Sequence, residues 1–272
     1  KVPFRILNLA STESALAEGL RDEGFPSFDM PVQADSPARF YPRDLFTYFP
    51  DKRIALLEPS SFDIEDSTRN GVDLKCSCWG EGGRVISAGD CGVVFRHPDK
   101  SEAREQETLD LLRERGMRIA EIPAGIATSL DSSGTVTSVS YDPHIDRMAS
   151  LIVDADGAYH LFIAPTFQTG ALTSPDRAAQ SIDAVRRACE GHAITVHVTE
   201  KMTTPMGTSL VQFPNGVIIT GCNEPGWLSL LQSVAGHDRI FATEIALSAY
   251  PAFGSAGIHC LVTESPEFFL SG

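Results

Sequence analysis

A cysteine near the end of the sequence lies in a setting suited to a nucleophile. Cys260 follows the glycine-rich segment 254–259 and precedes the apolar run Leu261-Val262-Thr263, which has β-strand character. Small residues let a substrate come close, and a strand would hold the sulfur in place, where a thiolate is a good nucleophile. Free cysteines are also among the most buried residues, so the same pattern fits an inert core cysteine.

A histidine and a carboxylate in the middle of the chain could complete such a site. His144 and Asp146 stand two positions apart, and in an extended segment their side chains would point to the same face. A histidine and a carboxylate on one face form an acid–base pair that can also bind a cation. Alone, the pattern is weak, because an isolated histidine is more often structural.

Two further acidic residues lie in unusual surroundings. Glu81 is enclosed by glycines in Gly80-Glu81-Gly82-Gly83, and Asp44 follows Arg43 within a segment rich in aromatic residues. The pair Arg43-Asp44 fits either a site loop or a loop ion pair. The glycines around Glu81 do not form a phosphate-binding pattern, since an acidic residue there would repel phosphate.

The patterns of strands and helices recur three times along the chain. In each copy, two strands joined by a tight turn precede an amphipathic helix and a further strand. The copies begin near residues 84, 148 and 208. The expected strands are 84–87, 91–96 and 117–122, then 148–153, 159–164 and 193–198, then 209–213, 217–220 and 240–247; the expected helices are 101–116, 174–191 and 225–234. Such repetition predicts a modular α/β architecture rather than one doubly wound sheet.

The two chain ends complete this pattern. Residues 4–9 are expected as a strand followed by a helix that ends near Gly24, and residues 257–263 as another strand. We expect these two segments to form one further unit, divided between the two ends of the chain. This unit would close the others into a ring. Residues 26–53 carry five prolines and are expected mostly as loop, before a short strand at 54–58.

The ordered motifs resemble those of the guanidine-modifying pentein superfamily, which includes agmatine and arginine deiminases, dimethylargininases and amidinotransferases. The superfamily's E-G-G, H-x-D and G-x-H-C motifs match 81–83, 144–146 and 257–260 in the same order. Arg43-Asp44 resembles the early R-D element of the agmatine deiminase branch. Arg84 stands where arginine deiminases carry an aspartate, which argues against that branch.

The resemblance implies a fold and a reaction. The fold is a five-bladed pseudo-symmetric α/β propeller of ββαβ repeats, formed by a single domain of residues 1–272. The reaction is hydrolysis of the C–N bond of a guanidino compound. In it, the Cys260 thiolate attacks to form a covalent thiouronium intermediate, and His144 acts as general acid and base. Glu81 is either a third carboxylate or the group that orients His144, and no metal or organic cofactor is required.

Substrate binding would rest on carboxylates, because a guanidinium is a planar, delocalised cation that pairs best with carboxylates in its plane. Asp44 and Asp146 are the candidates for this cradle. Arg43 and Arg147 are candidates to clamp a substrate carboxylate, or lie on a solvated surface. Agmatine, arginine and methylated arginines all present the same head group, so the substrate stays open.

Two other functions fit the same motifs. An amidinotransferase would pass the amidino group from the same intermediate to an amine rather than to water. A non-catalytic protein of the same fold, associated with the large ribosomal subunit, would not need Cys260. The complete set of cysteine, histidine and carboxylates argues against this last function.

Composition limits the partners and the compartment. A formal net charge of −14 over 272 residues argues against nucleic acid and is compatible with a small cationic substrate. No run approaches the roughly 20 apolar residues that span a bilayer. Six cysteines are too few for a disulfide scaffold, which favours the cytoplasm, and Cys76-Ser77-Cys78 lacks the second pair that a metal site needs. A homodimer is compatible with the sequence.

Overall fold

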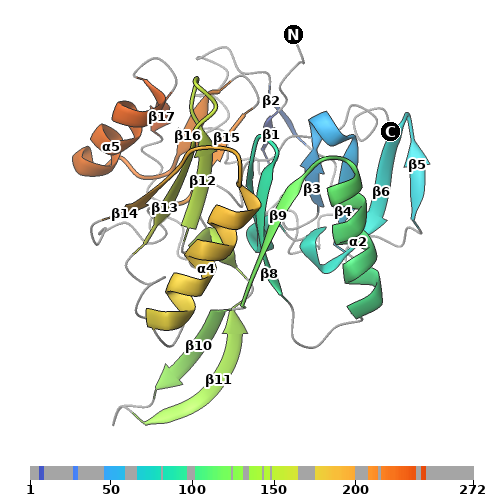
Figure 1. Ribbon diagram of the computed structural model, residues 1–272, viewed down its shortest axis with the longest axis horizontal. Coiled ribbons are helices and arrows are strands. Elements are labelled where there is room, and N and C mark those ends of the chain that lie inside the picture. Colours follow the sequence, from blue (N-terminus) through green and yellow to red (C-terminus); the bar gives the residue numbers. More distant parts are fainter. Residues whose placement is uncertain are drawn as a thin grey trace.

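The computed structural model shows small mixed sheets flanked by a few helices (Figure 1). The described residues are 6–8, 27–29, 46–58, 66–80, 82–96, 102–123, 125–130, 135–142, 144–147, 149–164, 175–199, 208–213, 216–236 and 240–242. The expected strand at 257–263 and the expected helix ending near Gly24 lie outside them.

Three units share one strand order, and they confirm the predicted repeat. In each unit an antiparallel hairpin is followed by a helix, and the next strand pairs in parallel with the second hairpin strand. Unit 1 contains β7 (Val85–Ala88), β8 (Cys91–Arg96), α2 (Glu102–Glu114) and β9 (Arg118–Pro123). Unit 2 contains β12 (Ala149–Val153), β13 (Tyr159–Ile163), α4 (Pro175–Ala188) and β14 (Ile194–Val198). Unit 3 contains β15 (Leu210–Gln212), β16 (Ile218–Thr220), α5 (Pro225–Ala235) and β17 (Ile240–Ala242).

The helix boundaries follow local chemistry. α4 and α5 begin with Pro175 and Pro225, and proline suits the first helical position because its missing N–H has no partner there. The chain leaves α2 and α4 through Gly116 and Gly191, whose φ angles of +81° and +91° favour glycine.

A fourth sheet precedes unit 1 and was only partly predicted. It consists of β3 (Phe46–Phe49), β4 (Ile54–Leu57), β5 (Ser67–Arg69) and β6 (Val72–Cys76), in the order β3-β4-β6-β5. β3 is antiparallel to β4, and β4 is parallel to β6, as in the three units. The predicted strand at 54–58 is confirmed.

Residues 26–53, expected mostly as loop, contain two strands that were not predicted. β3 ends at Phe49, and Pro50 opens a 3₁₀ turn directly after it, so this proline bounds the strand rather than interrupting it. β2 (Ser27–Asp29) pairs in parallel with β1 (Ile6–Asn8), which confirms part of the strand expected at 4–9.

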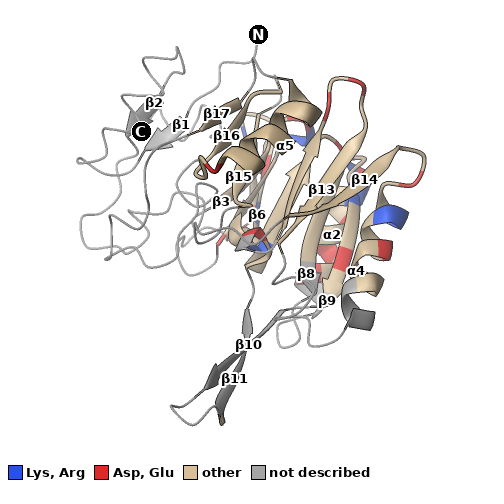
Figure 2. Cartoon of the chain, turned by 90° about the vertical axis from the view of Figure 1, so that its left-hand side faces the viewer, with Lys and Arg blue, Asp and Glu red and all other residues tan. Residues whose placement is uncertain are grey.

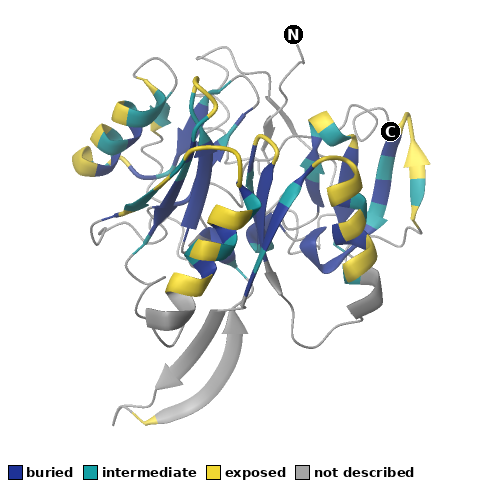
Figure 3. Cartoon of the chain, viewed as in Figure 1, coloured by how far each residue is buried: buried dark blue, intermediate teal, exposed yellow. Residues whose placement is uncertain are grey.

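The sheets of units 1 and 2 each contribute side chains to two cores, because neighbouring residues of a strand face opposite sides (Figure 3). The α2 core lies between the sheet of β3–β6 and unit 1, the α4 core between units 1 and 2, and the α5 core between units 2 and 3. In β7, Val85 enters the α2 core and Ile86 the α4 core; in β12, Leu151 enters the α4 core and Ile152 the α5 core. Each unit therefore packs against the unit before it.

The helices cover these cores with polar outer faces. In the described part of α4, an acidic region lies next to a basic one (Figure 2). Asp183 and Arg186 form an exposed ion pair of 3.4 Å. Exposed pairs of this kind contribute little stability but keep the face solvated. Among the described helices, none is long and apolar enough to cross a bilayer.

A hairpin outside these four sheets connects β9 to the second unit. β10 (Gly125–Leu130) pairs with β11 (Val136–Asp142), and the two strands extend away from the rest of the chain (Figure 1). The pairing of Gly125 with Asp142 closes the base of the hairpin. The chain therefore returns to the body just before His144.

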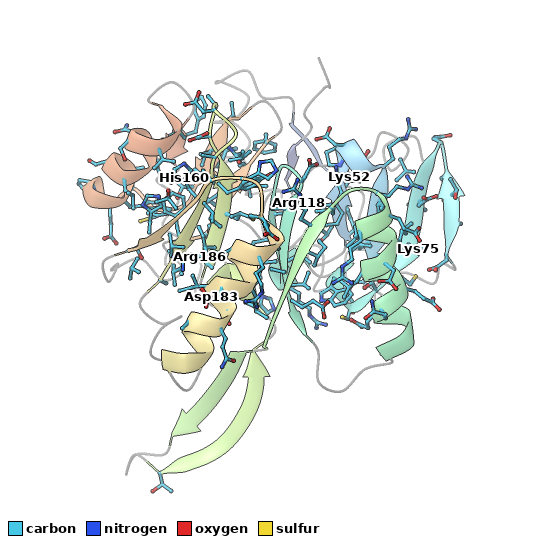
Figure 4. The ribbon with its side chains drawn as sticks, in the orientation of Figure 1. Lys52, Lys75, Arg118, His160, Asp183 and Arg186 are labelled. Atoms are coloured by element: carbon cyan, nitrogen blue, oxygen red, sulfur yellow. The ribbon has the colours of Figure 1, made fainter. Side chains whose placement is uncertain are left out.

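Three polar side chains, one of them His160 (Figure 4), form a chain of hydrogen bonds beside the α5 core. His160 on β13 donates through Nε2 to Oδ2 of Asp154 at 3.0 Å, and its Nδ1 lies 3.0 Å from Nε2 of His197 on β14. In the neutral form of His160, Asp154 holds the proton on Nε2, so the Nδ1 atom accepts from His197. The imidazole of His197 stacks on Phe162.

This arrangement makes the folded state sensitive to acid. Burial, and then the charge of His160, lower the pKa of His197. Folding thus lowers this pKa, so the unfolded chain binds more protons in acid. The corresponding stability is complete above the ordinary histidine pKa of about 6.5 and is lost as the pH falls below it.

We predict that the melting temperature falls between pH 7 and pH 5, and that His197→Phe makes this fall smaller, because phenylalanine keeps the stacking on Phe162 without a titrating group. Thermal unfolding followed by circular dichroism at several pH values measures it. His192→Asn, at an exposed histidine, is the matched control and should retain the wild-type slope. Equal slopes in the wild type and His197→Phe would contradict the assignment.

Candidate active site

Two of the predicted motifs meet directly in the structure. Gly83 belongs to a 3₁₀ turn, Gly82–Arg84, just before β7, and it lies against the imidazole of His144. A Cβ atom at Gly83 would lie 2.9 Å from Cε1 of His144 and nearer still to Nδ1, closer than real Cβ contacts. The glycine is needed here because any side chain would displace the imidazole.

His144 and Asp146 lie close together, although not in the predicted conformation. The extended segment was wrong: β11 ends at Asp142, and Ile145–Arg147 form a 3₁₀ turn. Nδ1 of His144 lies 3.7 Å from Oδ1 of Asp146, and the two side chains are 17% and 1% exposed. The distance is that of an ion pair with a protonated histidine rather than of a direct hydrogen bond.

Ile145, between these two residues, anchors the turn. Its side chain is buried in the α4 core together with Ile86 of unit 1 and Ala149 of unit 2. The anchor holds His144 and Asp146 at the junction of the two units. Asp146 therefore faces the Nδ1 side of the His144 imidazole.

The segment before Gly83 is held by a close backbone crossing. A Cβ atom at Gly80 would lie 2.6 Å from the carbonyl oxygen of Leu57, so only glycine fits beside the end of β4. The Ser77 N–H donates to the Leu57 carbonyl at 2.9 Å, and Thr47 Oγ1 donates to the Gly80 carbonyl at 3.3 Å. Trp79 is buried in the α2 core. These contacts fix the approach to Gly82.

The described cysteines are inaccessible to a substrate. All five are buried: Cys76, Cys78, Cys91, Cys189 and Cys222. Cys78 Sγ donates to Glu105 of α2 at 2.6 Å, and burial together with this acceptor raises the pKa of Cys78 far above its ordinary value, despite the nearby Arg84. The thiol of Cys78 therefore stays protonated at neutral pH.

Most other predicted site residues lie outside the described residues. These are Cys260, Glu81, Asp44 and Arg43. The backbone of Arg147 ends the 3₁₀ turn that carries Asp146, but its side chain is also outside what is described. Within the described residues, no three His, Cys, Asp or Glu side chains are arranged to hold a metal ion.

Two contributions to the site were not predicted. The contact of Gly83 with the imidazole of His144 was not predicted, although the paired glycines after Glu81 are typical of a site where another segment lies close to the backbone. The link from Cys78 to Glu105 also has no sequence signal, since the two residues are 27 positions apart.

Solved structures of guanidino-modifying enzymes are similar to this chain. ArgZ, an arginine dihydrolase from the ornithine–ammonia cycle in cyanobacteria, has a TM-score of 0.59 and 11% identity, covering 97% of this chain and 40% of its own. DDAH from Pseudomonas aeruginosa, complexed with citrulline, has a TM-score of 0.53 and 10% identity, covering 96% of this chain and 99% of its own. C. jejuni agmatine deiminase has a TM-score of 0.50 and 11% identity, covering 96% and 81%.

These similarities establish the fold. It is the fold of the guanidino-modifying pentein structures, so the resemblance that the motifs predicted is confirmed at that level. The chain spans about 40% of the length of ArgZ. No family model matches the sequence, and no curated protein matches it.

With His144 as the expected general acid and base, we predict that Gly83→Ala lowers turnover on a guanidino substrate by roughly 100-fold, because the added methyl group moves His144 and a small misplacement of such a group has an effect of that size. The melting temperature should change little, since the imidazole can rotate away. Steady-state kinetics and thermal unfolding of the same preparation separate the two effects.

Gly226→Ala is the matched control. A Cβ atom at Gly226 of α5 meets nothing within 4 Å, so this variant should retain wild-type turnover. Unchanged turnover in Gly83→Ala would show that the position of His144 does not matter for the reaction.

Proposed function

We propose that the chain is a cysteine-dependent hydrolase that cleaves a C–N bond of a guanidino compound. The observation that carries this proposal is the contact of Gly83 with His144, which joins the E-G-G and H-x-D motifs on a fold similar to that of guanidino-modifying hydrolases. Asp146 lies 3.7 Å from the same imidazole. A histidine with a buried carboxylate beside it is suited to proton transfer.

We also propose that residues 1–272 form one five-bladed α/β propeller. Four of the described sheets repeat one pattern of strand directions, and the parallel pair of β1 and β2 matches the last two strands of such a unit. The run 257–263 would supply the missing strand of this fifth unit. In a closed ring, that strand brings Cys260 to the end of the repeat at which Gly83 and His144 meet.

The reaction would proceed in two steps. The Cys260 thiolate attacks the central guanidinium carbon, and the tetrahedral adduct expels an amine to which His144 gives a proton, leaving a thiouronium. His144 then takes a proton from a water molecule that attacks the same carbon, and the C–S bond breaks to return the thiolate. The products are a ureido compound and ammonia or a small amine.

Carboxylates would hold the substrate. Asp44, Asp146 and Glu81 are the proposed partners of the planar cation, and Arg43 and Arg147 are proposed to contact a carboxylate on its tail. The net charge of −14 favours a cationic ligand. We expect an arginine-, agmatine- or methylarginine-like substrate. We also expect the protein to act in the cytoplasm, without nucleic acid or membrane partners.

The burial of the other cysteines supports the assignment of Cys260. Cys78 is held as a neutral thiol, and Cys222, in a loop before α5, is 1% exposed. A thiolate nucleophile needs access to its substrate as well as a low pKa. Among the six cysteines of the chain, Cys260 alone lies in a G-x-H-C motif.

We predict that the protein releases ammonia or a small amine from at least one guanidino compound with no amine acceptor present. Cys260→Ala should lower turnover by about 10³-fold or more, because no other group replaces the nucleophile. A panel of agmatine, arginine and methylated arginines, assayed for ammonia, methylamines and ureido products, measures this.

Cys222→Ala serves as the control for removing a buried thiol and should retain activity. Strict dependence on an added amine would identify an amidinotransferase instead. An inactive panel, together with a Cys260 thiol that resists alkylation in the folded protein, would contradict the enzyme and favour a binding protein of the same fold.

A further inference from the structure

Two cysteines from neighbouring units touch each other in the α4 core. Cys91 is the first residue of β8, and Cys189 follows α4 directly. Their sulfur atoms are 2.9 Å apart, although the residues are 98 positions apart in the chain. A disulfide bond is about 2.05 Å long, so a movement of less than about 1 Å would join them.

The groups around this pair favour a thiolate on Cys91. The pKa of Cys91 is lowered, chiefly because the thiol of Cys189 donates a hydrogen bond to it. Burial acts in the opposite direction, whereas the Tyr159 hydroxyl and the charge of Arg118 lower the pKa further. Burial, and then the neighbouring Cys91, raise the pKa of Tyr159 to about 12, so the hydroxyl remains a donor. Thiolates are the form of cysteine that reacts with oxidants.

Arg118 is held in place at this point. Its guanidinium donates to the Glu190 carbonyl at 2.7 Å, which ties the start of β9 to the turn after α4 (Figure 4). The cation therefore stays where its charge acts on both cysteines.

The pair lies just beneath the surface. Each cysteine is 1% exposed, but its neighbours in sequence, Asp90 before Cys91 and Glu190 after Cys189, are both exposed. Opening of these two turns would admit a small oxidant without unfolding the sheets. Local openings of this kind at the ends of elements need much less free energy than global unfolding.

We propose that Cys91 and Cys189 are an oxidisable pair that a peroxide converts to a disulfide joining unit 1 to unit 2. The Cys91 thiolate attacks the O–O bond and becomes a sulfenic acid, with release of hydroxide. Hydroxide takes the proton of Cys189, and the new thiolate attacks the sulfur of Cys91 and expels its hydroxyl group, which leaves as water with the proton that the Cys91 thiol lost on ionisation. In total, two thiols are oxidised by two electrons, and one hydrogen peroxide is reduced to two waters.

The disulfide would close a loop that contains the hairpin β10–β11, His144 and Asp146. A cross-link over about 100 residues restricts the unfolded chain strongly, so oxidation stabilises the folded protein. This site is separate from the proposed reaction, since neither sulfur belongs to the predicted catalytic set.

The test uses the full chain with Cys260→Ala, so that oxidation of Cys260 does not complicate the result. After treatment with hydrogen peroxide and removal of the excess, non-reducing peptide mapping by mass spectrometry should find the peptides of Cys91 and Cys189 linked. The melting temperature should rise by roughly 5 °C and return to its starting value with dithiothreitol.

Variants assign the effect to the pair. Adding Cys91→Ala or Cys189→Ala should abolish the rise, whereas Cys222→Ala, at another buried cysteine, should retain it. The proposal fails if both thiols remain reduced after oxidant treatment, if either is linked to a different cysteine, or if the rise persists in both alanine variants. Should these variants not fold, the peptide map of the parent protein decides the question alone.

Discussion

Burial of both sheet faces is the constraint on which this structure depends. Strand residues of unit 1 enter the α2 core and the α4 core in turn, and those of unit 2 enter the α4 core and the α5 core. A unit without its neighbour would expose one apolar face to water, at a free-energy cost that grows with the exposed area. The units are therefore stable together rather than one by one, as in other repeat architectures.

The candidate site follows from this packing. Gly83 stands just before β7, and His144 stands just before β12, so the two residues occupy similar places in units 1 and 2. When the units pack through the α4 core, the starts of their first strands come together, and Ile145 in that core sets the position of the histidine. The start of β15 continues the series, because Ser150 donates to the Thr208 carbonyl there. The repeat brings residues about 60 positions apart into contact without a dedicated binding loop.

The repeat could be predicted because its signals are local. A tight turn, a proline at the first helical position and a glycine after the helix each act within a few residues, and together they located three ββαβ units. β3 was missed because a high proline content suggested loop, whereas Pro50 stands just past the end of the strand. The turn at Ile145 was taken for a strand because the H-x-D spacing suits both. Contact between Gly83 and His144 depends on the packing of whole units, which no short segment encodes.

The hairpin β10–β11 connects units 1 and 2 through a base whose position is fixed and a tip whose length is free to vary. Its base is closed by the pairing of Gly125 with Asp142, so the ends of the hairpin stay together whatever lies between them. His144 comes two residues after that closed base, in a turn held by Ile145. Insertions or deletions toward the tip, around Thr135, would lengthen or shorten the hairpin without changing the path of the chain into His144. The size of this projection can thus vary while the position of His144 between units 1 and 2 stays the same.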